Sequence, residues 1–257
     1  MSRVEVIGPA TLFLGDALEI IPTLSGVSDV LCDPPYSSGG QYRGDRAQKT
    51  SAKYQSSEHR DLHAEFTGDN RDQRGFGFWS ALWLGACRSV MKGGGLCGLF
   101  TDWRQLPTST DALQAGGFVW RGVVVWDKTE GARPQLGRWR NQAEFLVWGT
   151  NGPRDLTGPV APGVFRQAVG GEEKHHMAGK PIRFLRDLMA PCGELILDPF
   201  MGSGSMGVAA LQSGRRYIGI ELVPGHFDAA CRRFEALVRH HPREGADLQA
   251  DLLERRR

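Results

Sequence analysis

Four consecutive residues, Asp33, Pro34, Pro35 and Tyr36, directly follow an apolar run, Asp29–Cys32, that is typical of a buried strand. A loop at the carboxyl end of a parallel strand points into the ligand crevice of its sheet. The two prolines fix φ and remove two backbone donors, so the Asp33 carboxylate and the Pro34 carbonyl can converge as acceptors. Such a pair suits the two N–H bonds of an exocyclic amino group, while the planar ring that carries this group stacks on Tyr36.

Holding both hydrogens of an amino group changes what its nitrogen can do. The nitrogen lone pair is normally delocalised into the ring, and two hydrogen bonds favour a pyramidal nitrogen whose lone pair faces an electrophile. The tetrapeptide therefore indicates group transfer to an amine and does not resemble a hydride-transfer site. The alternative interpretation is a rigid Pro-Pro turn at the end of a strand, with Tyr36 packed in the core.

A glycine-rich loop follows a second strand-like run, Glu194–Leu197, and leads into a helix. Its glycines satisfy the spacing G-x-G-x-x-G at Gly202, Gly204 and Gly207. Glu221 ends the next strand 221 − 202 = 19 positions later, where a ribose-binding acid belongs. A nicotinamide-dependent oxidoreductase is one hypothesis, but only 257 − 221 = 36 residues follow Glu221, so the other strands must come from upstream. A further alternative is a tight strand-to-helix turn without a ligand.

Both motifs need a sheet to position them, and short apolar runs alternate with helix-like segments along the chain, as in a parallel sheet covered by helices. The runs predicted as strands are Val4–Ile7, Thr11–Leu14, Asp29–Cys32, Leu96–Phe100, Val119–Trp126, Glu144–Trp148, Leu195–Leu197 and Tyr217–Ile220. The segments predicted as helices are Ala17–Leu24, Phe78–Met91, Pro181–Met189, Met206–Gln212 and His226–His240. The sequence thus predicts an α/β fold with a mostly parallel sheet and helices on both faces.

The two motifs resemble those of a known family. Asp33–Tyr36 resembles the D-P-P-Y catalytic motif of the DNA amino-methyltransferases, and Asp198–Ser205 resembles their D-P-F-x-G-S-G-[ST] S-adenosylmethionine loop. The order along the chain, catalytic motif first, is similar to the beta group, whose Rossmann-like fold is circularly permuted. The likeness extends through Leu14–Ala17, Trp126–Lys128, Arg140–Trp148 and His176–Pro181, so it covers nearly the whole chain.

The resemblance implies transfer of a methyl group from S-adenosylmethionine to the N6 amine of an adenine flipped out of DNA. Asp33 favours adenine, since family members that methylate N4 of cytosine, the alternative substrate, more often resemble S-P-P-Y. The implied catalytic residues are Asp33, Pro34, Pro35 and Tyr36. The implied cofactor-binding residues are Asp16, Ala17, Cys32, Lys180, Pro181, Asp198, Pro199, Phe200, Gly202, Ser203, Gly204, Ser205, Glu221 and Leu222.

Basic and aromatic residues interleave between Arg121 and Arg140, where five basic residues stand against two acidic ones, a local balance of 5 − 2 = +3. Such a segment suits contacts with phosphates and stacking on bases. We expect Trp120 and Trp126 to lie in the core of the fold. The residues predicted to contact DNA, expected to be double-stranded, are Arg133, Arg138, Trp139 and Arg140.

The predicted organisation is one catalytic domain over residues 1–241 and a polar tail over 242–257. A polar insert at residues 37–75 directly follows the tetrapeptide and is expected to act as a lid that orders on DNA. The Gly- and Pro-rich segment 150–175 is expected to be irregular and is a candidate for target recognition. The active unit is expected to be a monomer or a homodimer.

Composition excludes several other classes of protein. The 257 residues are 40% hydrophobic and 23% charged, with a net charge of 31 − 29 = +2, which excludes wholesale disorder. The five cysteines form no CxxC pair, and His175-His176 lacks a third ligand at suitable spacing, so we expect reduced thiols, no metal and a cytoplasmic location. A catalytically inactive DNA-binding module is the remaining rival hypothesis.

Overall fold

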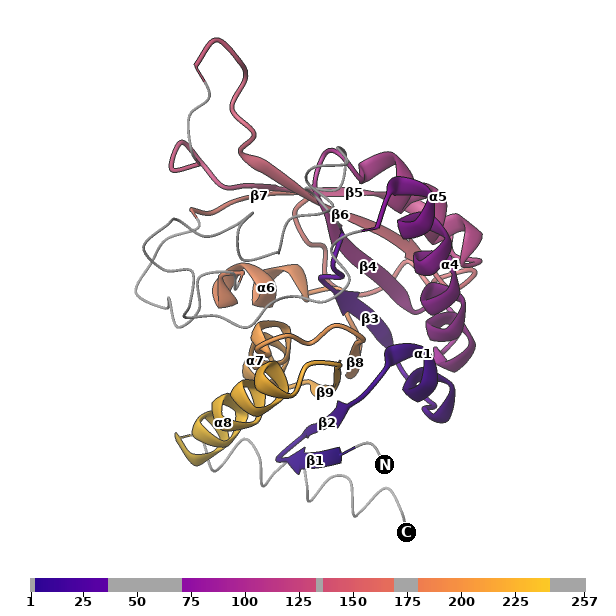
Figure 1. The fold of residues 1–257 in the computed structure, drawn as a ribbon, viewed down its shortest axis with the longest axis vertical. Coiled ribbons are helices and arrows are strands. Elements are labelled where there is room, and N and C mark those ends of the chain that lie inside the picture. The colour runs from indigo at the N-terminus through magenta and orange to yellow at the C-terminus, as the bar shows by residue number, and fades with distance from the viewer. Residues whose placement is uncertain (1–2, 37–70, 133–135, 169–179, 241–257) are drawn as a thin grey trace.

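A computed structural model describes residues 3–36, 71–132, 136–168 and 180–240. Within these ranges the chain forms a nine-stranded sheet in the order β1-β2-β9-β8-β3-β4-β6-β5-β7 (Figure 1). The strands are β1 (Arg3–Ile7), β2 (Ala10–Leu14), β3 (Asp29–Cys32), β4 (Leu96–Thr101), β5 (Val119–Asp127), β6 (Ala143–Thr150), β7 (Val164–Arg166), β8 (Leu195–Asp198) and β9 (Arg216–Glu221). The five pairs β2·β9, β9·β8, β8·β3, β3·β4 and β5·β7 are parallel, which confirms the predicted fold class. That this order arose by circular permutation stays a prediction.

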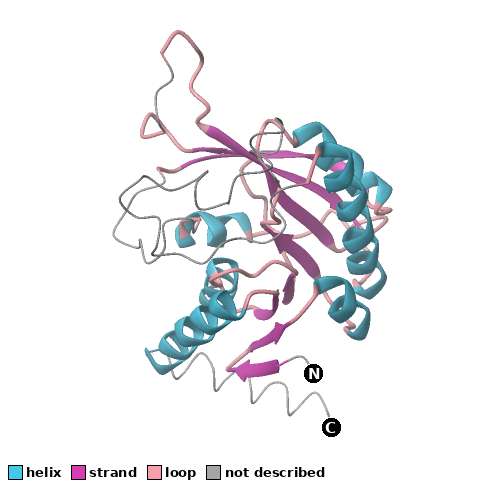
Figure 2. Ribbon diagram, in the orientation of Figure 1, coloured by secondary structure: helices cyan, strands magenta, loops and turns pink. Residues whose placement is uncertain are grey.

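Helices cover both faces of the sheet (Figure 2). The helices are α1 (Ala17–Ile20), the 3₁₀ turn η1 (Ile21–Thr23), α4 (Gln73–Val90), α5 (Leu106–Ala115), α6 (Ile182–Leu188), α7 (Ser205–Gln212) and α8 (Pro224–His240). One core joins α1, α4 and α5 to the sheet through side chains such as Trp83 and Leu113. The other core joins α6, α7 and α8 to the opposite face through Phe184 and Phe234. Among the residues that the structure describes, none of the helices combines the length and the apolar character needed to span a bilayer.

The sheet changes its direction of winding between β8 and β3. β8 continues through α7 to its neighbour β9 on one side, whereas α4 stands in the chain between β3 and its other neighbour β4. Val30 of β3 lies opposite Leu197 of β8, so the residues that follow the two strands are level at one edge of the sheet. Ligands of open α/β sheets bind at such a switch point, outside the carboxyl ends of the strands.

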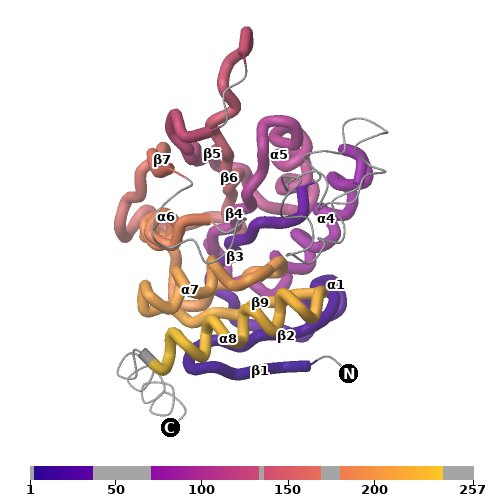
Figure 3. The backbone as a smooth tube through the Cα atoms, turned by 60° about the vertical axis from the view of Figure 1, so that its left-hand side comes forward, coloured from indigo at the N-terminus to yellow at the C-terminus, as the bar shows by residue number. Residues whose placement is uncertain are grey.

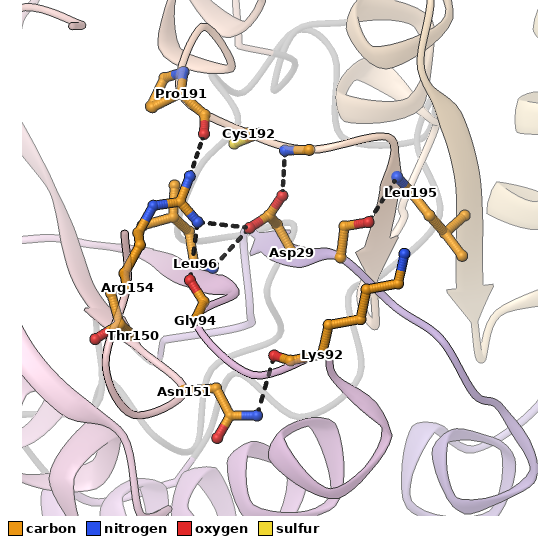
Figure 4. Close-up of polar contacts among 12 residues, drawn as sticks. Asp29, Lys92, Gly94, Leu96, Thr150, Asn151, Arg154, Pro191, Cys192 and Leu195 are labelled. Carbon is orange, nitrogen blue, oxygen red and sulfur yellow. Dashed lines mark hydrogen bonds and ion pairs between the residues drawn. The ribbon is translucent and has the colours of Figure 1, made fainter. Parts of the chain in front are cut away.

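At the opposite edge of the sheet, polar contacts connect the amino ends of β3, β4 and β8 (Figure 4). The buried carboxylate of Asp29 accepts hydrogen bonds from the backbone N–H groups of Leu96 and Gly193. Arg154 donates to the carbonyls of Gly94 (2.8 Å) and Pro191 (2.6 Å) beside it. A cavity of about 320 Å³ opens here, but Asp29 and Arg154 in its lining already bond the backbone, so this cluster fixes the starts of β3, β4 and β8.

The structure differs from the sequence predictions in three respects. Helix α5 and strand β7 were not predicted, because the first turn of α5 contains Pro107 and weak helix formers and β7 has three residues in a Gly- and Pro-rich stretch. The prediction of Trp120 as a core residue was wrong, since its side chain is 45% exposed at the start of β5, whereas Trp126 is buried as expected. Residues 73–75 of the expected insert belong to α4, which Asp72 caps, and 37–70 lie outside the described residues.

Candidate active site

The carboxylate of Asp33 lies at the switch point, directly after β3. Its Oδ2 accepts a hydrogen bond from Lys180 Nζ, which the chain brings in just before α6. Its Oδ1 is buried and has no hydrogen-bond partner among the residues that the structure describes. Burial raises the pKa of Asp33, and the Lys180 ammonium opposes this rise. Asp33 thus has one oxygen held by the protein and one unsatisfied acceptor.

Lys180 is nine-tenths buried and faces groups from two strands. Its ammonium lies 3.6 Å from Glu144 Oε2 on β6 and 4.2 Å from the centre of the Phe100 ring on β4. Burial would lower the pKa of Lys180, but the carboxylates of Asp33 and Glu144 outweigh it, so the pKa lies above its usual value. Lys180, predicted to bind the cofactor, is therefore first a partner of Asp33.

The glycine loop between β8 and α7 forms the second part of the site. Gly202 and Gly204 have φ angles of +55° and +83°, which side chains other than glycine rarely adopt. A Cβ atom at Gly204 would lie 2.6 Å from the Phe234 ring, whereas at Gly202 it would meet nothing within 4 Å. Gly204 thus allows α7 to pack on α8, and Gly202 faces open space.

Glu221, at the end of β9, closes this loop from the other side. Its Oε2 accepts a hydrogen bond from the N–H of Gly202 and its Oε1 accepts one from Val223, both at 2.8 Å. A carboxylate oxygen can accept two hydrogen bonds, and each oxygen of Glu221 accepts one from the chain. One acceptor position per oxygen is therefore left for a ligand. The Gly15 N–H donates to the Glu221 carbonyl at 2.9 Å, which places Asp16 and Ala17, at the start of α1, beside this acid.

The remaining predicted cofactor residues have varied surroundings. Asp198 is buried, accepts from the Tyr217 hydroxyl at 3.0 Å and from the Phe200 N–H at 3.1 Å, and burial raises its pKa to about 7. The Phe200 ring packs on Trp79 and Trp83 of α4. Cys32 ends β3, and Pro199 and Ser203 follow β8 at this edge. Pro181 precedes α6, Ser205 begins α7, and Leu222 is exposed after β9.

The predicted DNA contacts lie apart, on the connection between β5 and β6, which extends away from the sheet (Figures 1 and 3). Trp139 is 93% exposed there, Arg138 is exposed, and the Arg140 guanidinium donates to the Glu130 carbonyl at the base of the connection. Arg133 lies outside the described residues.

Sequence reasoning missed Glu144, Lys128 and Arg233. Lys128 Nζ donates to Glu144 Oε1 at 2.9 Å, and Arg233 of α8 donates to Ser205 Oγ, also at 2.9 Å. Glu144 carries a usable signal, because an acid inside an apolar strand needs a buried partner. Arg233 carries no such signal, since it is one of several basic residues on the polar side of an amphipathic helix.

Comparison with known proteins shows the family to which this chain belongs. A sequence family described as DNA methylase matches residues 165–232. The protein named "Putative methylase YubD" of Escherichia coli (strain K12) is 31% identical over 230 residues, which cover 88% of this chain and 90% of YubD.

Two solved structures share the fold. The M1.HpyAVI–SAM complex has a TM-score of 0.63 at 21% identity and covers 87% of this chain and 98% of its own. The PvuII DNA methyltransferase (cytosine-N4-specific) also has a TM-score of 0.63, at 14% identity, and covers 95% of this chain and 97% of its own. With the match to YubD over most of both chains, these findings show that the chain belongs to the family of DNA amino-methyltransferases, which act on adenine N6 or cytosine N4 and use S-adenosylmethionine.

Proposed function

We propose that this DNA methyltransferase acts on the N6 amine of adenine in double-stranded DNA, with Asp33, Pro34, Pro35 and Tyr36 as its catalytic residues. The observation that carries the proposal is the buried, unsatisfied Oδ1 of Asp33. A buried acceptor without a partner is costly, and the N–H of an amino group would satisfy it.

The residues around the glycine loop fit S-adenosylmethionine. The open face of Gly202 leaves room for a ligand beside the backbone, and Glu221 retains acceptor positions for ribose hydroxyls. Asp16 would lie near the adenine of the cofactor, because its loop is bonded to the Glu221 backbone. When bound, the cofactor supplies an electrophilic methyl group on a sulfonium.

The chain's own residues orient the amine that receives this methyl group. Asp33 Oδ1 and the Pro34 carbonyl accept its two N–H bonds, and Tyr36 stacks on the base, so the nitrogen lone pair faces away from both acceptors. The cofactor would supply the methyl group to this nitrogen, and the electron pair of the S–C bond that breaks would stay on sulfur. The methylated amine would then release one proton to water. Because the amine is paired inside a duplex, the base must first rotate out of the helix.

Asp33, the first residue of the tetrapeptide, supports adenine over cytosine, because family members that methylate N4 of cytosine more often resemble S-P-P-Y. Cytosine N4 presents the same pair of N–H donors, and this chain shares its fold with a cytosine-N4-specific enzyme. Cytosine is therefore the second candidate base.

DNA contacts are assigned to Arg133, Arg138, Trp139 and Arg140 on the β5–β6 connection. The segment from Gly152 to β7 is a candidate for target recognition, because Leu156 and Val160 are almost fully exposed on it.

Mass spectrometry of nucleosides tests the proposal. Unmethylated genomic DNA is treated with the full chain and a cofactor whose methyl group is deuterated, so that new methyl groups are distinguished from old ones. We expect deuterated N6-methyladenine. Deuterated N4-methylcytosine alone would overturn the choice of base, and no deuterated nucleoside would overturn the proposal.

A further inference from the structure

Glu144 is a partly buried acid, with 17% of its side chain exposed, that the proposed reaction leaves without a role. It stands on β6 between apolar side chains, opposite Trp126 of β5. Its two oxygens contact different lysines, Oε1 with Lys128 at 2.9 Å and Oε2 with Lys180 at 3.6 Å. Burial would raise the pKa of Glu144, but the two lysines outweigh it and hold the pKa below its usual value. Glu144 is thus a carboxylate kept ionised between two ammonium groups.

These contacts form a row of alternating charges that ends at the site. The row runs from Lys128, at the end of β5, through Glu144 and Lys180 to Asp33. Four different parts of the chain contribute one charge each, so the row exists only in the folded protein. Asp33 alone presents an oxygen of this row without a partner.

We propose that Glu144 is a positioning residue for methyl transfer, which holds Lys180 on Oδ2 of Asp33 so that Oδ1 stays free for the amino group of the base. This inference rests on the proposed function, because it assumes that Asp33 receives the target amine. Glu144 itself does not touch the substrate and acts through Lys180.

The need for Glu144 follows from the surroundings of Lys180. Among the described residues, the charged groups that face Lys180 are Asp33 and Glu144, and the third neighbour is the Phe100 ring. A buried ammonium with one carboxylate loses its proton more easily than one with two. Without Glu144 the Lys180 ammonium also loses its second ion pair. A lysine side chain with a single ionic partner rotates more freely about its four-carbon chain. Either change releases Oδ2 and lets the Asp33 carboxylate rotate.

A purely structural role for Glu144 predicts something different. If the acid only neutralised Lys128 at the base of the β5–β6 connection, its loss would lower stability or weaken DNA binding. The turnover number at saturating DNA and its dependence on pH would then stay as they are.

The test replaces Glu144 by Gln and by Asp in the full chain, with Glu194→Gln as the matched control. Glu194 is exposed before β8, at the amino end of the strands and away from the site. Methyl transfer to unmethylated genomic DNA is measured across pH, together with the affinity for S-adenosylhomocysteine and the unfolding midpoint. Lysine ¹⁵N resonances, assigned to Lys180 by its substitution with Arg, report the Lys180 pKa directly.

We expect Glu144→Gln to lower kcat about tenfold or more, with KM for DNA and the affinity for S-adenosylhomocysteine within about twofold of the wild type. Because removing Glu144 lowers the pKa of Lys180, the alkaline limb of the kcat profile moves to lower pH. Glu144→Asp keeps the charge and restores a large part of kcat, and Glu194→Gln behaves as the wild type.

An unchanged kcat and an unmoved alkaline limb in folded Glu144→Gln would overturn the inference while leaving the proposed function intact. If Glu144→Gln does not fold, the ¹⁵N resonance of Lys180 in the wild type provides the test. A Lys180 pKa below its usual range would then overturn the inference. If the wild type transfers no methyl group to DNA, the proposed function fails, and the Lys180 pKa still tests the pairing with Glu144.

Discussion

The two carboxylate oxygens of Asp33 have different surroundings. Lys180 holds Oδ2, whereas Oδ1 is buried without a partner among the described residues. Burial raises the pKa of Asp33. Only the ionised carboxylate accepts hydrogen bonds at both oxygens, so activity should fall as the pH drops through a pKa above the ordinary value for aspartate.

Replacing Asp33 by Ala removes the acceptor and should reduce methyl transfer by about 10²-fold or more, the usual cost of losing a group that orients the reacting atoms. The affinity for S-adenosylhomocysteine should change less than about twofold, because the Gly202–Glu221 contact is separate from Asp33. Single-turnover transfer and calorimetry measure the two quantities. Full transfer activity would contradict the mechanism, and lost cofactor affinity would move Asp33 to the cofactor site.

The sequence predicted the positions of the proposed site residues in the fold better than their contacts. Asp33 and the glycine loop are short local motifs, so their placement at strand ends follows from the neighbouring apolar runs. Lys180 and Asp33 are 147 positions apart, and only the paired strands decide that their side chains meet. The role of Glu144 depends on the same long-range packing, which no local pattern encodes.

At the scale of elements, two glycines of the G-x-G-x-x-G motif have different roles. Gly207 lies in α7 against α8 and β9, where a Cβ atom would lie 2.6 Å from the Tyr217 ring and closer still to Phe234. Gly202 stands before the helix with φ +55° and open space around it.

Gly207→Ala should therefore lower the free energy of unfolding by about 1–3 kcal/mol through overpacking. Gly202→Ala should cost about 1 kcal/mol of backbone strain in stability and weaken cofactor binding more than tenfold, since its methyl group occupies the ligand's space. Urea unfolding and calorimetry separate the two effects. The opposite ranking of the two variants in cofactor affinity would contradict this division.

Tyr217 links β9 to β8 through Asp198, and the link depends on pH. Burial raises the pKa of Asp198 to about 7, against the hydrogen bonds from Phe200 and Tyr217. Since the folded pKa is above the unfolded one, the folded protein binds this proton more tightly. The free energy of unfolding therefore falls as the pH rises toward 7, and above that the cost of the buried charge is fully present.

Tyr217→Phe keeps the stacking on Phe234 and removes only the hydroxyl. It should lower the free energy of unfolding by about 1–3 kcal/mol at about pH 8, where the bond is to a charged group, and by about 1 kcal/mol or less at about pH 5.5. Urea titrations at the two pH values measure the difference. Equal losses at both would mean that Asp198 does not change its protonation in this range.

The sequence predicted helices and strands correctly where the local hydrophobic pattern agrees with the tertiary packing. The strands β3, β8 and β9 are short apolar runs beside turn residues, and their bounds match within one residue. Helix α5 was missed because its first turn, Leu106-Pro107-Thr108, has low helix propensity and is stabilised by burial of Ala112 and Leu113. Tertiary contacts decided that helix, and the local sequence does not contain them.

At the scale of the whole molecule, the proposed catalytic and cofactor residues and the proposed DNA contacts lie in two different regions, the switch point and the β5–β6 connection. The residues proposed for catalysis and cofactor binding gather near the carboxyl ends of β2, β9, β8 and β3. The β5–β6 connection, on which Arg138 and Trp139 stand, extends beyond the sheet (Figure 1). Lys128 and Glu144 join the two regions, since they stand where the connection leaves β5 and enters β6. A net charge of +2 is too small to attract DNA over the whole surface, so binding should depend on this local segment.

Trp139 and Arg138 should contribute to DNA binding in distinguishable ways. Trp139→Ala should weaken binding by about 1–3 kcal/mol through lost stacking and leave the salt dependence unchanged, because no charge is removed. Arg138→Ala should reduce the slope of log K against log salt by about 1, the effect of one lost phosphate contact. Trp120→Ala is the matched control, since Trp120 is also exposed but stands at the start of β5, the far end of that strand. Anisotropy titrations on duplex DNA at several salt concentrations measure all three, and equal losses from Trp120→Ala and Trp139→Ala would place the DNA elsewhere.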